Sequence, residues 1–214
     1  MRPQLIETLR VEADGRMPLL PWHIERLGAS ATALGYRWSI DAPQRAVARA
    51  AATIPEGIAH RMRLLFSDDG VIDIENSVLP PLPADPCVAV ATRRLDFHEP
   101  LLRHKTTHRP WYRDASAWIA ADPQHFDLLY LNQRDELCEG SRSNVYLLLD
   151  GVWTTPPTEC GLLPGVQRAA LLDDEKVHEA VLTMADVKRA SAVRISNALR
   201  GWVDVRLLDE PVVL

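Results

Sequence analysis

The sequence lacks any apolar run that approaches the roughly 20 residues of a membrane-spanning helix. It also lacks a basic tract, and its formal net charge of -5 at pH 7 argues against a general binder of nucleic acids or anionic membranes. The first residues contain no apolar segment of the kind that directs secretion. We therefore expect a cytoplasmic protein that binds neither membranes nor nucleic acids.

Cysteine is scarce, and the chain has only Cys87, Cys138 and Cys160. Their odd number and wide spacing fit reduced thiols better than a disulfide framework. A metal site is not indicated either. His98, His104 and His108 are close in sequence, but they span a proline-containing loop, and no cysteine or carboxylate pair has ligand spacing. The sequence predicts no metal site.

The chain also lacks internal repeats, low-complexity tracts and a strict alternation of strands and helices, so we expect mixed sheets rather than a doubly wound one. Its 214 residues, 47% hydrophobic, are enough for one large domain or two small ones around a cleft. Prolines concentrate in residues 79–86, which we interpret as an extended linker. The prediction is an α+β fold of two lobes, with a small N-terminal domain at 1–82 and a larger domain at 83–214.

Apolar periodicity and turn residues give the expected elements. The predicted strands are 5–11, 61–66, 71–74, 87–92, 126–131, 144–149, 152–154 and 192–196. The predicted helices are 22–36, 43–52, 111–121, 166–172 and 183–190. Asp41 stands where it could cap the second helix.

Three short segments carry chemistry. Residues 103–109 (Arg-His-Lys-Thr-Thr-His-Arg) surround Lys105 with possible positive charge, which favours the neutral amine that forms an imine. Glu139 precedes a small, polar run and could hold a ring nitrogen protonated. Residues 161–168 lead into an apolar helix, whose first amides suit a phosphate. Taken alone, each segment is more typical of a surface loop or an ordinary helix start. Together they predict pyridoxal 5'-phosphate (PLP) chemistry.

These segments belong to a longer series of motifs in a fixed order. It runs through residues 5–10 (Leu-Ile-Glu-Thr-Leu-Arg), 23–27 (His-Ile-Glu-Arg-Leu), 104–109, 139–144, 155–157, 161–166 and 197–201 (Asn-Ala-Leu-Arg-Gly). The series resembles the fold-type IV PLP enzymes of the class IV aminotransferase family and is most similar to their 4-amino-4-deoxychorismate lyases. The resemblance implies a two-lobed class IV fold and a homodimer.

The resemblance also implies residue roles. Lys105 would be the Schiff-base lysine and Glu139 the partner of the pyridine nitrogen. Arg26 would bind the cofactor phosphate, since a guanidinium matches its forked geometry. The remaining phosphate contacts would come from the amides of Val166 and Gln167 and from Asn197. Gln167 stands where many family members have threonine, and the tyrosine usual five residues after the lysine is absent.

Arg61 and Arg63 alternate on one face of a predicted strand, and we expect one or both to bind a substrate carboxylate, although an exposed strand face fits as well. Arg109, four residues after Lys105, is typical of lyase-like members. The leading hypothesis is removal of pyruvate from 4-amino-4-deoxychorismate to give 4-aminobenzoate. The alternatives are transamination of branched-chain or D-amino acids and a non-catalytic family member.

Overall fold

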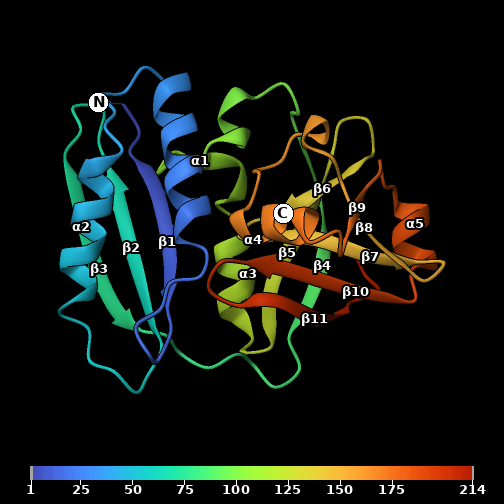
Figure 1. Cartoon of the computed structure of the whole chain (residues 1–214). Coiled ribbons are helices and arrows are strands. Elements are labelled where there is room, and N and C mark those ends of the chain that lie inside the picture. Colours follow the sequence, from blue (N-terminus) through green and yellow to red (C-terminus); the bar gives the residue numbers. More distant parts are fainter. Residues whose placement is uncertain (1, 214) are drawn as a thin grey trace. The chain divides into compact units, whose positions relative to one another are not determined.

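The computed structural model describes residues 2–213, and the chain forms two compact units (Figure 1). Unit 1 comprises Met1–Pro81 together with His104–His108, and unit 2 comprises Leu82–Arg103 and Arg109–Leu214. The segment His104–His108 is numbered within the larger predicted domain, but it packs with unit 1 because it pairs with the first strand.

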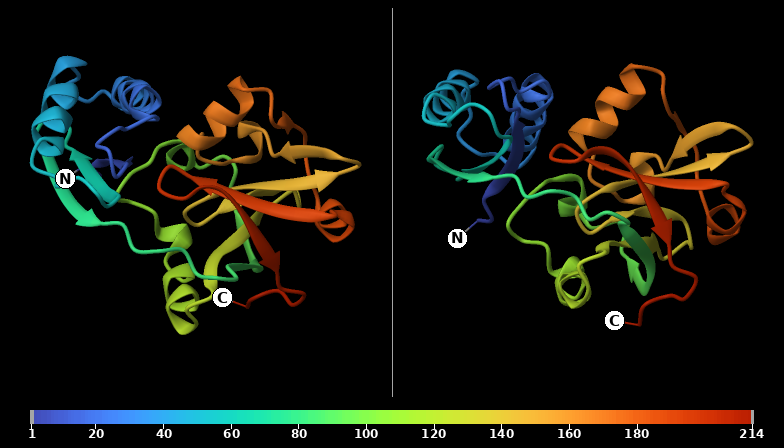
Figure 2. Two further views of the ribbon diagram at one scale, coloured as in Figure 1. Left: turned by 60° about the horizontal axis from the view of Figure 1, so that its bottom comes forward. Right: turned by 90° about the horizontal axis from the view of Figure 1, so that it is seen from below.

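Unit 1 is a three-stranded antiparallel sheet with two helices. Its strands β1 (Leu5–Val11), β2 (His60–Phe66) and β3 (Ile72–Val78) lie in the order β1-β2-β3. Helices α1 (Leu20–Ala33) and α2 (Asp41–Ala51) follow β1 in sequence. Figure 2 shows both helices on the same face of the sheet. These elements confirm the predicted strands at 5–11 and 61–66 and the first two predicted helices.

The core of unit 1 follows from strict alternation in β1 and β2, where every second side chain is buried. The inward residues of β1 and β2 pack against Leu27 and Ala31 of α1 and Val47 of α2. The predicted capping role of Asp41 is wrong. Asp41 is the first helical residue of α2, and Ile40 occupies the cap position without a side-chain cap. The carboxylate still stabilises the helix through the positive end of its dipole.

Unit 2 is built on an eight-stranded mixed sheet in the order β6-β5-β4-β11-β10-β7-β8-β9. The strands are β4 (Cys87–Leu95), β5 (His125–Asn132), β6 (Leu137–Gly140), β7 (Asn144–Leu149), β8 (Val152–Thr155), β9 (His178–Glu179), β10 (Ala192–Asn197) and β11 (Gly201–Leu207). β4 pairs in parallel with β5 and β11, and β8 with β9, whereas the other pairs are antiparallel. The expected mixed sheet and α+β class are confirmed.

The helices of unit 2 are short: α3 (Ala115–Ala121), α4 (Val166–Asp173) and α5 (Met184–Arg189), with 3-10 turns at Pro100–Arg103, Pro110–Tyr112 and Thr158–Cys160. The single predicted helix at 111–121 is therefore wrong in its first turn, which the 3-10 turn occupies. Within residues 2–213, none of the helices combines the length and the apolar character that crossing a bilayer requires.

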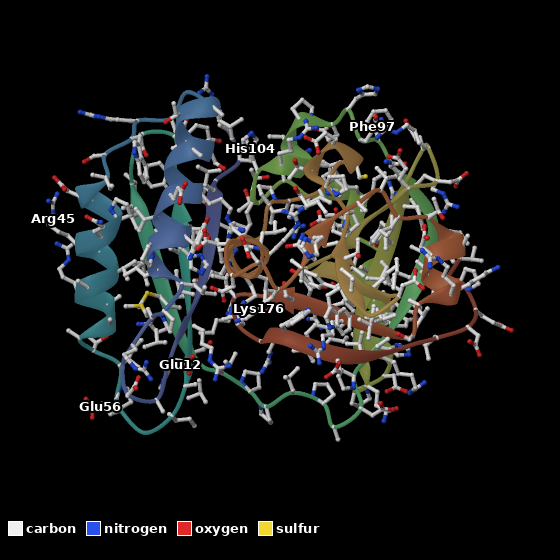
Figure 3. The ribbon with its side chains drawn as sticks, turned by 45° about the vertical axis from the view of Figure 1, so that its right-hand side comes forward. Glu12, Arg45, Glu56, Phe97, His104 and Lys176 are labelled. Carbon is white, nitrogen blue, oxygen red and sulfur yellow. The ribbon has the colours of Figure 1, made fainter. Side chains whose placement is uncertain are left out.

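Gly161 fixes the chain just before α4. It has a φ of 88°, in the left-handed region that favours glycine. An added Cβ would lie 2.7 Å from the Cα of Phe97, a residue labelled in Figure 3. Two independent features therefore disfavour a side chain at position 161: the backbone conformation and the close contact with Phe97.

Gly161→Ala should lower the free energy of unfolding more than Gly151→Ala. Gly151 also has a positive φ, of 84°, but an added Cβ meets nothing within 4 Å. We expect a loss of about 1 kcal/mol from backbone strain at Gly151 and a further loss of about 1–3 kcal/mol from overpacking at Gly161. Chemical denaturation of both variants measures the difference, and equal losses would contradict the close contact with Phe97.

Candidate active site

Lys105 lies in a short segment that extends the sheet of unit 1. Thr106 forms an antiparallel bridge with Leu5, and the amide of Ile6 donates to the carbonyl of Lys105 at 2.7 Å. Two further hydrogen bonds join Thr107 to Gln4: the amide of Gln4 donates to the Thr107 hydroxyl, and the amide of Thr107 donates to the Gln4 carbonyl. The backbone from Lys105 to Thr107 is thus bound to β1 and its N-terminal flank.

The residues on either side of Lys105 both contact elements of unit 1. Thr106 is fully buried, and Nδ1 of His104, labelled in Figure 3, lies 3.0 Å from the hydroxyl of Ser30 on α1. The polypeptide around Lys105 is thus held against both β1 and α1.

Arg26, the predicted phosphate ligand, is bound to a buried carboxylate in unit 1. Its Nε donates to Oε1 of Glu7 at 3.0 Å and its Nη2 to Oε2 at 2.5 Å. His23 Nδ1 lies 2.6 Å from the same Oε2. Glu7 is on β1, whereas His23 and Arg26 are one turn apart on α1. Only 3% of Glu7 and 1% of His23 are exposed.

The charges in this triad favour an ionised Glu7 and a neutral His23. Burial raises the pKa of Glu7, but the positive charge of Arg26 and the hydrogen bonds from His23 and Arg26 outweigh it and lower that pKa to about 2. Burial lowers the pKa of His23, and the charges of Arg26 and Lys105 lower it further against the opposing effect of Glu7. Lys105 is thus close enough to act on the triad.

Arg61 and Arg63 lie on β2, on the sheet face opposite Glu7. Glu7 pairs with the inward Leu64, whereas Arg63 pairs with Thr8 and is half-buried. The nearest carboxylate contact of Arg63 is a long one, 3.8 Å to exposed Glu75. The structure therefore places the two arginines on the sheet face opposite Glu7 and separates them from Arg26, which binds Glu7.

In unit 2, Glu139 is a buried residue of β6 with only 2% of its surface exposed. The hydroxyl of Tyr112 donates to its Oε1 at 2.7 Å. Burial raises the pKa of Tyr112 well above its usual value, and the negative charge of Glu139 adds to the rise, so the phenol stays protonated as a donor. Arg109 lies over the Tyr112 ring, with its guanidinium carbon 4.6 Å from the centroid.

Asp127 organises the loop that follows Glu139. Its buried carboxylate accepts hydrogen bonds from the amide and hydroxyl of Ser141, at 2.9 and 2.5 Å, and from the hydroxyl of Ser143 at 2.5 Å. Gly140 passes so close that an added Cβ would lie 2.2 Å from Asp127 Oδ2. The position of Glu139 therefore depends on a carboxylate of the preceding strand, β5.

The start of α4 is shaped by Asn144 of β7. Its Nδ2 donates to the carbonyl of Leu163 at 2.9 Å, and an added Cβ on Gly165 would lie 2.0 Å from its Oδ1. Gly165 caps the helix in an extended conformation without a side-chain hydrogen bond. The amides of Val166 and Gln167 thus stand in the first turn of an α-helix that no side chain of the cap residue covers.

Asn197, at the end of β10, has mainly local contacts. Its Oδ1 accepts from the amides of Leu199 and Arg200, at 3.1 and 3.0 Å, and its Nδ2 donates to the carbonyl of Arg142 at 3.3 Å. These bonds shape the β10–β11 turn, so any cofactor contact from Asn197 would be made by a side chain that the turn already orients.

Sequence reasoning missed Glu7, His23, Asp127 and the contact of Tyr112 with Glu139. A signal existed for two of them. Glu7 is the one carboxylate among the inward residues of β1, and Asp127 interrupts the apolar run of β5. A buried charge in a strand needs partners, so both positions indicate an organised polar site.

Tyr112→Phe should lower the free energy of unfolding by about 1–3 kcal/mol, because the buried Glu139 loses a hydrogen-bond donor. Tyr130→Phe is the matched control. Tyr130 packs against Tyr112, and its buried hydroxyl has no partner among residues 2–213. Its removal should change stability by less than about 0.5 kcal/mol. Thermal unfolding compares the two variants, and equal effects would argue against the Tyr112–Glu139 bond.

Glu7→Gln should remove a pH-dependent part of the stability. The folded pKa of Glu7, about 2, lies below its ordinary value of 4.5. The stabilisation is therefore complete above about pH 5 and is lost as the pH falls from 4.5 toward 2, with a size of up to about 3 kcal/mol. Urea titrations of the native and variant proteins should converge at low pH. Glu25→Gln, an exposed neighbour on α1, should give a constant difference near zero.

Several known proteins are similar to this chain over most of its length. A Schizosaccharomyces pombe protein named an aminodeoxychorismate lyase is 28% identical over 206 residues, which cover 92% of this chain and 87% of that protein. The crystal structure of a Mesorhizobium loti protein described as an amino-acid aminotransferase matches with a TM-score of 0.87 at 34% identity, covering 97% of this chain and 100% of that chain. The 4-amino-4-deoxychorismate lyase of Pseudomonas aeruginosa matches with a TM-score of 0.78 at 26% identity, over 98% of this chain and 84% of that one.

The family model described as amino-transferase class IV matches residues 4–208, nearly the whole chain. This match spans every motif on which the sequence resemblance depends, from the strand with Glu7 to the turn after Asn197. The chain therefore belongs to the class IV aminotransferase family and is a PLP-dependent enzyme.

Proposed function

We propose that this enzyme is a lyase that removes pyruvate from 4-amino-4-deoxychorismate and releases 4-aminobenzoate, a folate precursor. The observation that carries the proposal is the similarity to a relative named as this lyase over 92% of the chain. A local feature supports it. The position five residues after Lys105 is Pro110, which begins a 3-10 turn, so the tyrosine typical of aminotransferases is absent there.

The residues present fit PLP. Glu139 is a buried carboxylate whose one oxygen is fixed by Tyr112, as a partner of a protonated ring nitrogen requires. The amides of Val166 and Gln167, at the positive end of α4, suit a phosphate dianion. Arg26 supplies a guanidinium held by a buried partner, and Asn197 supplies an amide. When bound, PLP supplies an electrophilic ring that accepts an electron pair from the substrate.

Lys105 has two roles in this proposal. Its Nζ would hold the cofactor, and it would also take the proton from the substrate carbon that carries the amino group. The carbon–oxygen bond to the enolpyruvyl group then breaks, the carbon ring becomes aromatic, and the released enol gains a proton to become pyruvate. The reaction needs no oxidant and no second substrate.

Arg61 and Arg63 suit the recognition of this substrate, which carries two carboxylates. Both arginines lie on the half-buried face of β2, opposite the face that carries Glu7. A guanidinium binds a carboxylate with two parallel hydrogen bonds, so the pair could hold the substrate in one orientation. The long 3.8 Å contact of Arg63 with exposed Glu75 competes weakly with such a ligand.

A second candidate function is transamination of an amino acid. The Mesorhizobium loti structure, described as an amino-acid aminotransferase, favours it. In this reaction Lys105 would move a proton between the substrate carbon and the cofactor, and a keto acid would receive the amino group. The two reactions share the cofactor and the lysine, so they are separated by their products.

We also propose that the enzyme works as a homodimer in the cytoplasm. The dimer rests on the family resemblance. The compartment is supported by the three cysteines, all of which are free and buried, as is usual in a reducing environment.

The test is product analysis with PLP and 4-amino-4-deoxychorismate. We expect equal amounts of 4-aminobenzoate and pyruvate without an added keto acid, and no product from Lys105→Ala. The chain has two other lysines, Lys176 and Lys188, both exposed. Alanine at either should leave the rate within about twofold. Product formation only when a keto acid is added, with its conversion to an amino acid, would establish transamination instead.

A further inference from the structure

We propose that Glu7 is a positioning residue, which holds the guanidinium of Arg26 in the orientation that binds the cofactor phosphate. This inference rests on the proposed role of Arg26 and extends it to a residue that does not itself touch the cofactor.

The contacts between the two side chains fix the guanidinium plane. Oε1 of Glu7 accepts from Nε at 3.0 Å and Oε2 accepts from Nη2 at 2.5 Å, so Glu7 occupies one whole edge of the Arg26 fork. Two parallel hydrogen bonds define both the direction and the tilt of a planar group. The edge that carries Nη1 is thereby turned away from Glu7.

The carboxylate is in turn held from its other side. His23 Nδ1 lies 2.6 Å from Oε2 of Glu7. Since the carboxylate is ionised, it accepts this hydrogen bond and Nδ1 carries the proton. Nε2 of His23 is buried and has no partner among residues 2–213, so no second contact draws the ring away from Glu7. The order of dependence runs from His23 through Glu7 to Arg26.

Burial makes this arrangement rigid. Glu7 is 3% exposed and the Arg26 side chain 11%. An arginine side chain at a surface must give up much of its rotamer freedom when it binds an anion. Here that entropy is lost during folding, so phosphate binding does not repeat the cost. The ion pair also keeps the buried guanidinium stabilised when no phosphate is bound.

The charge balance of Glu7, His23 and Arg26 shows why the orientation of Arg26 matters for phosphate binding. Ionised Glu7 compensates the charge of Arg26, and His23 is neutral, so the triad has no net charge. Attraction of an anion to Arg26 must therefore come from directed N–H bonds rather than from a general positive field. Loss of Glu7 should weaken phosphate recognition although it makes the site more positive.

The experiment compares PLP with pyridoxal, which has the same ring and aldehyde but no phosphate. Equilibrium binding is followed by absorbance of the ligand and by protein fluorescence. In Glu7→Gln we expect the Kd for PLP to rise about tenfold or more, whereas the Kd for pyridoxal should stay within about twofold. Glu25→Gln removes a charge from the residue next to Arg26 and should alter neither value.

A double-mutant cycle tests whether Glu7 acts through Arg26. In an Arg26→Gln background, Glu7→Gln should cause no further loss of PLP affinity, because the group that it orients is already absent. If Glu7→Gln does not fold, Glu7→Asp retains the charge but withdraws the carboxylate by one carbon. It should show the same selective loss for PLP.

The outcomes separate this inference from the proposed function. A native protein that prefers PLP strongly over pyridoxal, with a preference unchanged in the Glu7 variants, would overturn the positioning role and leave the cofactor assignment intact. Equal weakening of both ligands would assign Glu7 a purely structural role. A native protein with no preference for PLP would overturn both.

Discussion

A carboxylate removed from water must be surrounded by hydrogen-bond donors, and this constraint organises both units. Glu7 in unit 1 is enclosed by His23 and Arg26. In unit 2, Asp127 accepts hydrogen bonds from the loop after β6, and Glu139 accepts one from the hydroxyl of Tyr112. Each carboxylate lies on a strand of mainly buried apolar residues, so most of its partners come from neighbouring elements. The sheet holds each carboxylate in a fixed position, and the need to satisfy its hydrogen bonds determines which polar groups lie around it.

Sequence patterns predicted the elements with strong periodicity. The alternation at 5–11 and the apolar stripe at 22–36 were read correctly because one face of each is buried. β6 and β11 were missed for different reasons. β6 has four buried residues, two of them polar or glycine, and β11 alternates weakly with half-buried residues. Their strand character comes from pairing with β5 and β10 rather than from their own composition.

The candidate site was predictable as a set of reactive side chains but not as a set of contacts. Motifs indicated Lys105, Glu139 and Arg26 as candidates, because an amine, a carboxylate and a guanidinium have chemistry that follows from the residue type. The groups that orient them act through tertiary pairing across long sequence separations. Asp127 and Ser143 are 16 residues apart, and Tyr112 and Glu139 are 27 apart. No local sequence pattern predicts contacts between residues so far apart in the chain. An isolated charge in an apolar strand does indicate where one of the two partners lies.

The packing of residues 104–108 with unit 1 also affects whether the N-terminal part of the chain could be stable as a separate fragment. β1 is the terminal strand of the unit 1 sheet, and this segment supplies hydrogen bonds along part of its outer edge. A fragment made of residues 1–81 alone would leave that edge bare, and an uncovered edge strand is a template for pairing between molecules. The five residues around Lys105 therefore also protect the N-terminal sheet against self-association.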